Sequence, residues 1–357
     1  MKSKVFKALL PMAAVLMLAS CTSEKEEDQP MSRAIDFRPA MATRSQAFDN
    51  SNLSEIRVTA LLGDDVYFDQ ETYAEQPGST VFSSSNEYLW PALDALEFWA
   101  YAPADLNGSN GVNVVIGNDA NKRVENFVPS SDIASHQDLI VAHAKGARAQ
   151  FETTGMPLDF EHKLAQIEVL AKSDNALYDF EITGVRIGSL AGEGTYYFGA
   201  DGTDKWTLTT GKAPHTYESD YTTPIVLNST PQSVMGAGGN AMVIPQQLTA
   251  WDVDGDKSNT KGGTYLSVKL TVTKKDNGLQ LFPSESSTSA WAAIPIDTDL
   301  QSGMKYIYTL DFTHGGGHID PKDPDPGEPV LGGPITFNVN VKAWVESSED
   351  KDMKTTD

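Results

Sequence analysis

Strict alternation of apolar and polar residues is the feature that most constrains the fold of this chain of 357 residues. The pattern is clearest in residues 265–273, where four aliphatic residues alternate with polar ones: Leu266, Val268, Leu270 and Val272. Successive side chains of a β-strand point to opposite faces, so a period of two predicts a strand with one buried face. Similar segments recur at residues 54–62, 96–103, 112–116, 180–187, 194–198, 205–209, 241–244, 289–296, 305–312 and 334–344. Thr183-Gly184 within the segment 180–187 predicts a bulge, and the segments 194–198 and 205–209 predict a hairpin. The sequence therefore predicts an all-β fold.

The central stretch 157–171, PLDFEHKLAQIEVLA, admits two interpretations. Ala165, Ile167 and Val169 alternate with polar residues, which predicts a strand. A helix also fits, because Leu164, Ile167 and Ala171 are spaced i, i+3, i+7. Such a helix would reach residues 173–175 without a glycine to end it, so we expect a strand.

Length and composition limit the class of protein. A chain of this length in which 40% of the residues are hydrophobic suits two domains of ordinary size. The net charge of −22 predicts an acidic surface that repels phosphate backbones, so nucleic acid is not an expected partner. The chain has one cysteine, which excludes an intrachain disulfide and a cysteine-based metal site.

The N-terminus has the pattern of a lipoprotein signal peptide. Residues 1–20 combine a basic start with an apolar run that is too short to span a membrane. Leu18-Ala19-Ser20 precede the single cysteine, Cys21, as in a lipobox. We therefore expect Cys21 to carry acyl chains that anchor the chain to a membrane. The alternative is an ordinary secretory signal with a coincidental cysteine. Residues 21–44, which include an acidic run, would be a tether.

The sequence contains few candidate residues for metal binding or catalysis. Asp252, Asp254 and Asp256 lie at i, i+2, i+4 and form a weak candidate for Ca²⁺. The loop lacks the glycine and the glutamate that a calcium loop needs at its sixth and twelfth positions, so a solvated turn is the preferred interpretation. The sequence has no nucleophile elbow, phosphate-binding loop or dinucleotide fingerprint. We therefore expect no enzyme activity and no cofactor. Residues 320–329, DPKDPDPGEP, predict an extended spacer.

Several motifs resemble those of one family. Residues 159–166 read D-F-x-H-x-L-A-Q, residues 138–142 read D-L-I-V-A, and residues 335–344 read I-x-F-x-V-x-V-x-x-W. Together they resemble the fimbrillin family, lipoprotein subunits of the type V pili of Bacteroidales and their relatives. The resemblance implies two transthyretin-like Greek-key β-sandwich domains in tandem after the signal peptide. We place these domains at residues 45–173 and 174–346, followed by a polar tail at 347–357. From the residues alone, His162 is expected to be a packed or hydrogen-bonded structural residue.

The resemblance also implies a function. An Arg-specific protease cuts pilus-forming members near the position of Arg44, just after a short segment that holds Ile35 and Phe37. Arg33 and Arg38 are alternative sites, and the segment could instead be a first strand that is never removed. The implied protein is a fimbrial subunit or adhesin of the outer membrane surface. Its partners would be other fimbrial subunits or itself by donor-strand addition, the membrane through its lipid, and ligands on host or bacterial surfaces. The alternative function is a monomeric surface lipoprotein that binds glycans through Trp99, Trp206 or Trp291.

Overall fold

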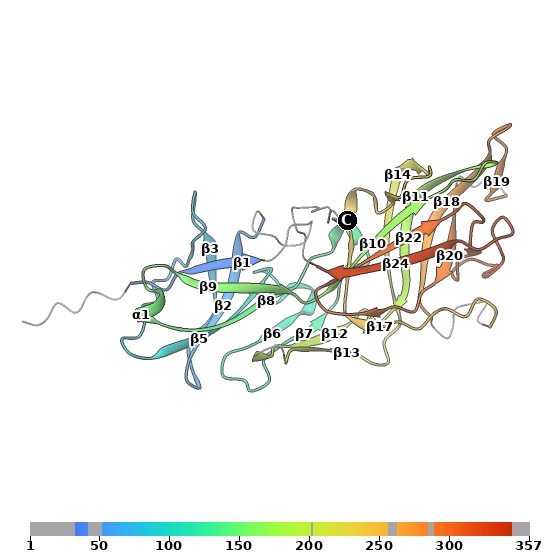
Figure 1. Ribbon diagram of the computed structural model, residues 1–357. Coiled ribbons are helices and arrows are strands. Elements are labelled where there is room, and N and C mark those ends of the chain that lie inside the picture. The colour runs from blue at the N-terminus through green and yellow to red at the C-terminus, as the bar shows by residue number, and fades with distance from the viewer. Residues whose placement is uncertain (1–32, 42–51, 201–202, 256–262, 285–288, 345–357) are drawn as a thin grey trace, which may run out of the picture.

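The structure is a computed structural model that describes residues 33–41, 52–200, 203–255, 263–284 and 289–344. Figure 1 shows an elongated molecule with a group of strands at each end and a smaller sheet between them. The one α-helix among the described residues, α1 (Arg148–Phe151), is a single turn, so the predicted all-β class is confirmed. Within those ranges, no helix has the length and apolar content needed to cross a bilayer.

The N-terminal sheet closes on itself as a barrel. In order around it, the strands are β1 (Phe37–Met41), β4 (Phe82–Ser83), β3 (Asp65–Glu75), β2 (Glu55–Leu62), β5 (Ala95–Ala102), β8 (Ile140–Ala147) and β9 (Met156–His162). Closure depends on β1, which pairs antiparallel with β4 and parallel with β9. Alternate side chains fill the interior, as in β2, where Ile56, Val58 and Ala60 are fully buried. We expected a β-sandwich here, and its closure into a barrel was not predicted.

The C-terminal half is built from two sheets whose apolar faces share one core. The first contains β15 (Gln232–Ser233), β10 (Ala165–Lys172), β22 (Met304–Asp311) and β24 (Thr336–Ala343) in that order, with β16 (Ala241–Val243) also paired to β10. The second contains β14 (His215–Val226), β11 (Tyr178–Leu190), β18 (Tyr265–Lys274), β20 (Ala290–Pro295) and β23 (His318–Ile319), with β19 (Gln280–Phe282) on β18. The register of β11 shifts between Ile182 and Gly184, which confirms the bulge that the sequence predicts there.

Strand pairing crosses the boundary that we expected after residue 173. β10 lies before that boundary, yet it pairs with β15, β16 and β22, all from the C-terminal half. The strand interpretation of this stretch is confirmed, but its ladder belongs to the second group of sheets. Alternation predicts a strand and its buried face; it does not identify the partner strand.

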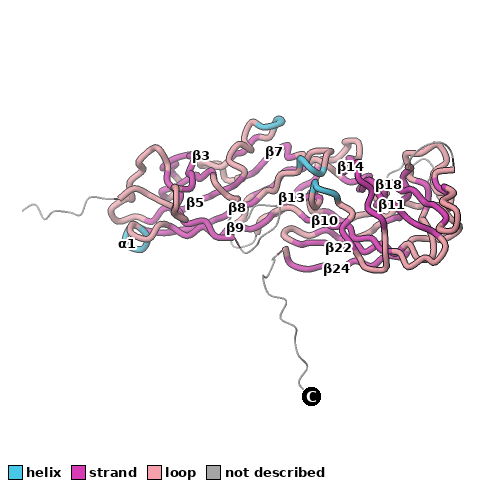
Figure 2. The backbone as a smooth tube through the Cα atoms, turned by 90° about the horizontal axis from the view of Figure 1, so that it is seen from above, coloured by secondary structure: helices cyan, strands magenta, loops and turns pink. Residues whose placement is uncertain are grey.

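A small sheet joins the two ends of the molecule. It contains β13 (Lys205–Leu208), β12 (Gly194–Tyr197), β7 (Arg123–Phe127) and β6 (Asn113–Val115), so it takes strands from both halves of the sequence. In Figure 2, β7 and β13 of this sheet lie between the barrel and the C-terminal sheets. A core cluster at this junction combines Tyr101 and Val141 of the barrel with Tyr196, Ile244 and Trp344. The expected hairpin of β12 and β13 is confirmed.

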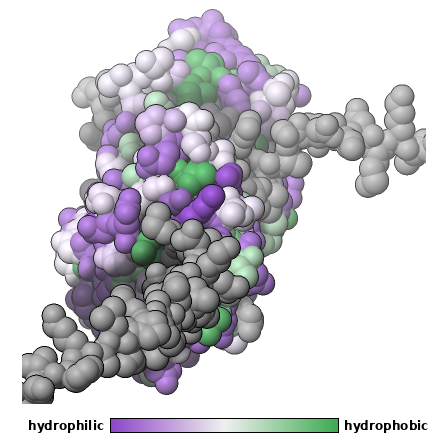
Figure 3. Space-filling view, turned by 90° about the vertical axis from the view of Figure 1, so that its left-hand side faces the viewer, coloured by the Kyte–Doolittle hydropathy of each residue, from purple (hydrophilic) through white to green (hydrophobic). Residues whose placement is uncertain are grey.

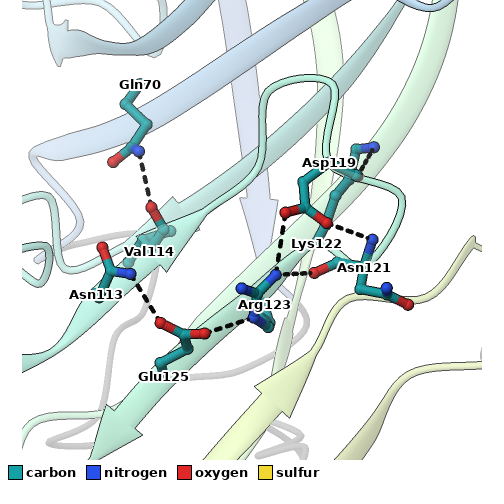
Figure 4. A network of polar contacts seen from close by, with 8 residues as sticks. All are labelled: Gln70, Asn113, Val114, Asp119, Asn121, Lys122, Arg123 and Glu125. Carbon is teal, nitrogen blue, oxygen red and sulfur yellow. Dashed lines mark hydrogen bonds and ion pairs between the residues drawn. The ribbon is translucent and has the colours of Figure 1, made fainter.

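Polar contacts support the junction sheet (Figure 4). The Gln70 amide on β3 donates from Nε2 to the Val114 carbonyl on β6, 2.9 Å away, which ties the barrel to this sheet. Arg123 forms ion pairs with Asp119 and Glu125. A backbone hydrogen bond from Asn121, and then the Arg123 guanidinium, lower the pKa of the Asp119 carboxyl.

The acidic, proline-rich segment 320–329 is a folded loop, not the extended spacer that the sequence predicts. Its ends meet, because the amide of Ile319 donates to the Glu328 carbonyl and that of Gly327 donates to the Ile319 carbonyl. Asp320 is fully buried, and its carboxylate contacts Arg186. Composition alone could not reveal this long-range ion pair. The remaining short elements are β17 (Gln246–Gln247), β21 (Asp299–Leu300) and 3-10 turns at Ser109–Gly111, Ile133–Ser135 and Gly236–Gly238.

Candidate functional site: an N-terminal strand and an exposed C-terminal strand

The first part of the candidate site is the position that β1 occupies in the barrel. Ile35 and Phe37 point into the barrel and are 2% and 0% exposed. The Phe37 ring meets the rings of Tyr73 and Phe98 edge-on, with centroids 4.6 and 5.1 Å apart. The backbone of the segment is also paired, since the Ile35 amide donates to the Tyr88 carbonyl at 2.7 Å and Asp36 accepts from the Met156 amide at 2.8 Å. This short segment is therefore part of the core of the barrel.

The second part is β24, the edge strand of the first C-terminal sheet, drawn in red in Figure 1. Among the described strands it pairs only with β22, and Phe337, Val339 and Val341 share a face with Leu310, Tyr308 and Tyr306. The β22 residues are buried, but Phe337 and Val341 remain 41% and 46% exposed. The predicted alternation is confirmed, while the expected burial of this face is wrong. As the last strand of its sheet, β24 lies where the opposing sheet leaves its apolar side chains partly uncovered.

The two strands share a short motif near opposite ends of the sequence. Residues 35–37 read I-x-F, and residues 335–337 read I-x-F as well. Both Ile35 and Phe37 fill the barrel, so the same spacing on β24 could present the same two side chains to the same positions. A direct comparison of the two ends of the sequence would have found this signal.

The third part lies at the junction, where three separate motifs meet. Asp138 precedes β8, His162 ends β9, and Trp344 follows β24. His162 donates from Nδ1 to Oδ2 of Asp138 across 2.5 Å, and its ring stacks on Trp344 with centroids 4.1 Å apart and planes 11° apart. All three side chains are at least nine-tenths buried. The prediction that His162 is a packed, hydrogen-bonded residue is confirmed, but its contact with the C-terminal end was not predicted.

Most of the sequence-predicted site residues lie elsewhere. Cys21 and Arg44 fall outside the described residues, as does Asp256. Asp252 accepts hydrogen bonds from the amides of Asp254 and Gly255, which forms a local turn. Across the described part of the chain, no three histidine, cysteine, aspartate or glutamate side chains are grouped to hold a metal ion.

The three tryptophans of the glycan-binding alternative do not form a platform. Trp99 is 6% exposed and stacks on His143, with ring centroids 4.0 Å apart. Trp206 is half-buried and donates from Nε1 to the Lys163 carbonyl at 2.6 Å, while half-buried Trp291 lies under the guanidinium of Arg186. Figure 3 shows the barrel end of the molecule, where apolar residues form separate patches among hydrophilic ones. The arrangement lacks the row of exposed rings that glycan stacking needs.

Comparisons with known proteins agree with this architecture. A family model described as Fimbrillin-like matches residues 41–344. A fimbrial protein from Bacteroides vulgatus has a similar structure, with a TM-score of 0.58, 14% sequence identity, and coverage of 87% of this chain and 99% of that one. A candidate cell adhesion protein from Bacteroides ovatus gives a TM-score of 0.50 at 16% identity and covers 88% of this chain and 99% of its own. At these identities the two structures show a shared fold. A search of curated protein sequences finds no match.

The family model matches most of the chain, and this coverage decides the family to which the chain is assigned. It spans the described barrel strands after β1, the junction sheet, the C-terminal sheets and Trp344. The assignment agrees with the expectation of a non-enzymatic protein. The chain belongs to the fimbrillin-like family.

Proposed function

We propose that this protein is a surface-anchored fimbrial subunit, or a fimbrillin-like adhesin, that assembles by strand addition after its N-terminal strand is removed. The position of β1 carries the proposal. β1 closes the barrel with five residue pairs to β9, yet it precedes Arg44 in the sequence. Cleavage at Arg44 would separate β1 from the chain and open a gap between β4 and β9. An extended segment of another subunit could fill that gap.

The C-terminal strand of a second copy is the proposed donor. In its own sheet, β24 leaves Phe337 and Val341 41% and 46% exposed, whereas the β1 position buries Phe37 completely. Moving Phe337 into that position would remove roughly 80 Å² of ring surface from water, which contributes about 2 kcal/mol. The I-x-F motifs set the register, with Ile335 in the place of Ile35 and Phe337 in the place of Phe37.

The net free energy of exchange is modest. Each ladder hydrogen bond contributes about 1 kcal/mol, and each buried aliphatic or aromatic side chain contributes about 1.5–3 kcal/mol. Ordering a free segment opposes these gains by about 1–2 kcal/mol per residue. β24 must also give up the eight residue pairs that it makes with β22. The durability of a fibre would therefore be kinetic and would come from slow exit of the inserted strand.

Arg-specific cleavage tests the proposal. Purified protein is treated with an Arg-specific protease and run unboiled on a denaturing gel. We expect a ladder of SDS-resistant oligomers that is absent in Arg44→Ala and in a chain truncated at Gly333. A ladder that persists in Arg44→Ala but disappears in Arg38→Ala would move the cut to Arg38. A single monomer band after complete cleavage would contradict assembly by this route.

The remaining parts of the proposal concern architecture and location. We infer that acyl chains on Cys21 anchor the subunit in the outer membrane, so that it projects from the cell surface with residues 21–44 as its tether. Its two ends would correspond to tandem transthyretin-like domains. Its partners would be other fimbrial subunits and ligands on host or bacterial cells, in keeping with the fimbrial and adhesion descriptions of structurally similar proteins. We do not favour a glycan-binding monomer, because the three candidate tryptophans are buried or half-buried.

A further inference from the structure

We propose that the stack of Trp344 on the His162–Asp138 pair is a clasp that holds the end of β24 and sets how often this strand leaves its sheet. The inference rests on the proposed function only for its biological consequence, which is control of the donor strand. The clasp itself is a property of the single, uncleaved chain. It is built from residues that the structure brings together from the barrel and from the C-terminal end.

The contacts of Trp344 are those of an anchor. The side chain is 2% exposed and lies in the junction cluster with Leu164 and Met242. Its backbone amide donates to the Gly303 carbonyl at 2.7 Å. One face of the indole lies on the imidazole of His162 at a centroid distance of 4.1 Å. A buried tryptophan with a stacked partner is the kind of contact that dominates the energy of a local packing site.

The His162–Asp138 pair fixes the plane on which Trp344 lies. Asp138 is 3% exposed, and its Oδ2 accepts the hydrogen bond from Nδ1 of His162. Its other oxygen, Oδ1, accepts no hydrogen bond from the described residues. Burying a carboxylate with one oxygen unpaired is costly, so an apolar pair of similar size would serve stability equally well. The pair instead provides orientation, since it holds the imidazole parallel to the indole.

The rest of β24 is held less firmly than its two ends. Seven of its eight residues are exposed, from Thr336 to Ala343 with only Val339 half-buried. At its root, Ile335 is 5% exposed and follows a loop that is fixed through Asp320. The Asp320 carboxylate pairs with Arg186 at 3.0 Å and accepts from the Ser267 hydroxyl at 2.5 Å. The loop that precedes β24 therefore stays in place when β24 leaves its sheet. The contact at Trp344 then controls how often β24 leaves.

The turn before β24 can serve as the hinge. Leu331 and Gly332 have φ angles of 55° and 70°, and Gly333 packs against the backbone carbonyl of His314 so closely that a Cβ would not fit. The backbone therefore already turns immediately before Pro334. Opening of the clasp would free the strand from Thr336 onward, whereas release from Pro334 also requires Ile335 to leave the C-terminal core. The preceding loop would stay attached through Asp320.

Hydrogen exchange of the uncleaved monomer tests the clasp. The variants are His162→Ala and Trp344→Leu, the second of which keeps an apolar side chain in the junction cluster. The matched control is His143→Ala, because His143 is also paired with a carboxylate, Glu97, and stacked on a tryptophan, but it lies on β8 and its partners Glu97 and Trp99 both lie on β5. The readout is the exchange rate of the amides of residues 336–343, compared with those of β18 and β2.

We expect both clasp variants to speed exchange in residues 336–343 by about tenfold, as the loss of a buried aromatic contact implies. β18 and β2 should exchange as in the unchanged protein, and the control should leave β24 unchanged. Unchanged exchange in β24, or an equal increase in all three strands, would overturn the proposal. Strand release and assembly are separable here: faster exchange of β24 without any ladder after Arg-specific cleavage would support the clasp and reject the proposed assembly.

Discussion

Replacing Phe37 by alanine should destabilise the uncleaved monomer severely. The side chain is 0% exposed and contacts Tyr73 and Phe98 edge-on. Truncation of a fully buried phenylalanine costs roughly 3–5 kcal/mol, from the lost burial and the cavity that remains. That is a large part of the roughly 5–15 kcal/mol by which ordinary domains are stable. The expected result is a large shift of the barrel's unfolding transition to lower urea concentration.

Phe337→Ala is the matched control, because it removes the same side chain from the second I-x-F motif. Phe337 is 41% exposed on an edge strand, and its ring centroid lies 6.4 Å from that of Tyr308. Its removal should cost the monomer about 1 kcal/mol. Tryptophan fluorescence during urea unfolding includes a signal from the barrel, since Trp90, one of six tryptophans, packs edge-on against Phe98 at 5.7 Å. A loss below about 1 kcal/mol for Phe37→Ala would refute the view that this side chain fills the barrel.

The order of the two effects should reverse after assembly. In an oligomer formed by strand addition, Phe37 has been removed and Phe337 occupies its pocket. Phe337→Ala should then lower the temperature at which SDS-resistant oligomers dissociate, because the truncation now leaves a cavity in the barrel. Oligomers that dissociate at the same temperature with and without Phe337 would show that this side chain is not the one inserted.

Three further outcomes are expected. Labelling with an alkyne fatty acid should mark the unchanged protein and not Cys21→Ser; labelling that survives the substitution would exclude acylation at Cys21. Melting temperatures with calcium and with a chelator should agree, since the Asp252 loop departs from a calcium loop. A melting temperature several degrees higher with calcium would overturn this prediction, because a ligand at 100 times its Kd stabilises the folded protein by about 2.7 kcal/mol. Burial lowers the pKa of His136 to about 4, so the unfolded chain binds more protons between pH 6.5 and 4. The free energy of unfolding should therefore fall by about 2 kcal/mol from pH 7 to pH 5. His136→Gln keeps an acceptor for the Met242 amide and should remove this pH dependence. An unchanged pH dependence in the variant would show that another group titrates.

Local patterns were sufficient to predict strands. The alternation around Val268 places β18 in the core, and Thr183-Gly184 marks the bulge in β11. Both features depend on residues that are adjacent in sequence, where side-chain period and glycine conformation act directly. The all-β fold class followed from such patterns, and the family followed from the motifs that resemble it.

Long-range pairing was not predictable from one sequence. The closure of the barrel by β1 depends on β9, which lies far along the chain. The exposure of Phe337 depends on β24 being the last strand of its sheet, which alternation cannot show. The contact of His162 with Trp344 likewise joins two motifs from distant parts of the chain. Cys21 and Arg44 remain predictions of the sequence alone.

Disulfide trapping between copies tests the central claim, that the C-terminal strand of one copy replaces β1 of another. In the structure Ala40 of β1 is opposite Asp159 of β9, so the I-x-F register would place Asn340 of the donor opposite Asp159. A chain that begins after Cys21 contains no other cysteine, and both Asn340 and Asp159 are exposed. Cysteines on directly opposed residues fall within the Cα separation that a disulfide requires.

The account predicts covalent oligomers for the Asn340→Cys, Asp159→Cys chain after Arg-specific cleavage. It predicts none before cleavage, and none for Lys342→Cys with Asp159→Cys, which would report a register shifted by two residues. Covalent oligomers from the Lys342 pair alone would contradict the register. Monomers from both pairs after complete cleavage would contradict strand replacement itself.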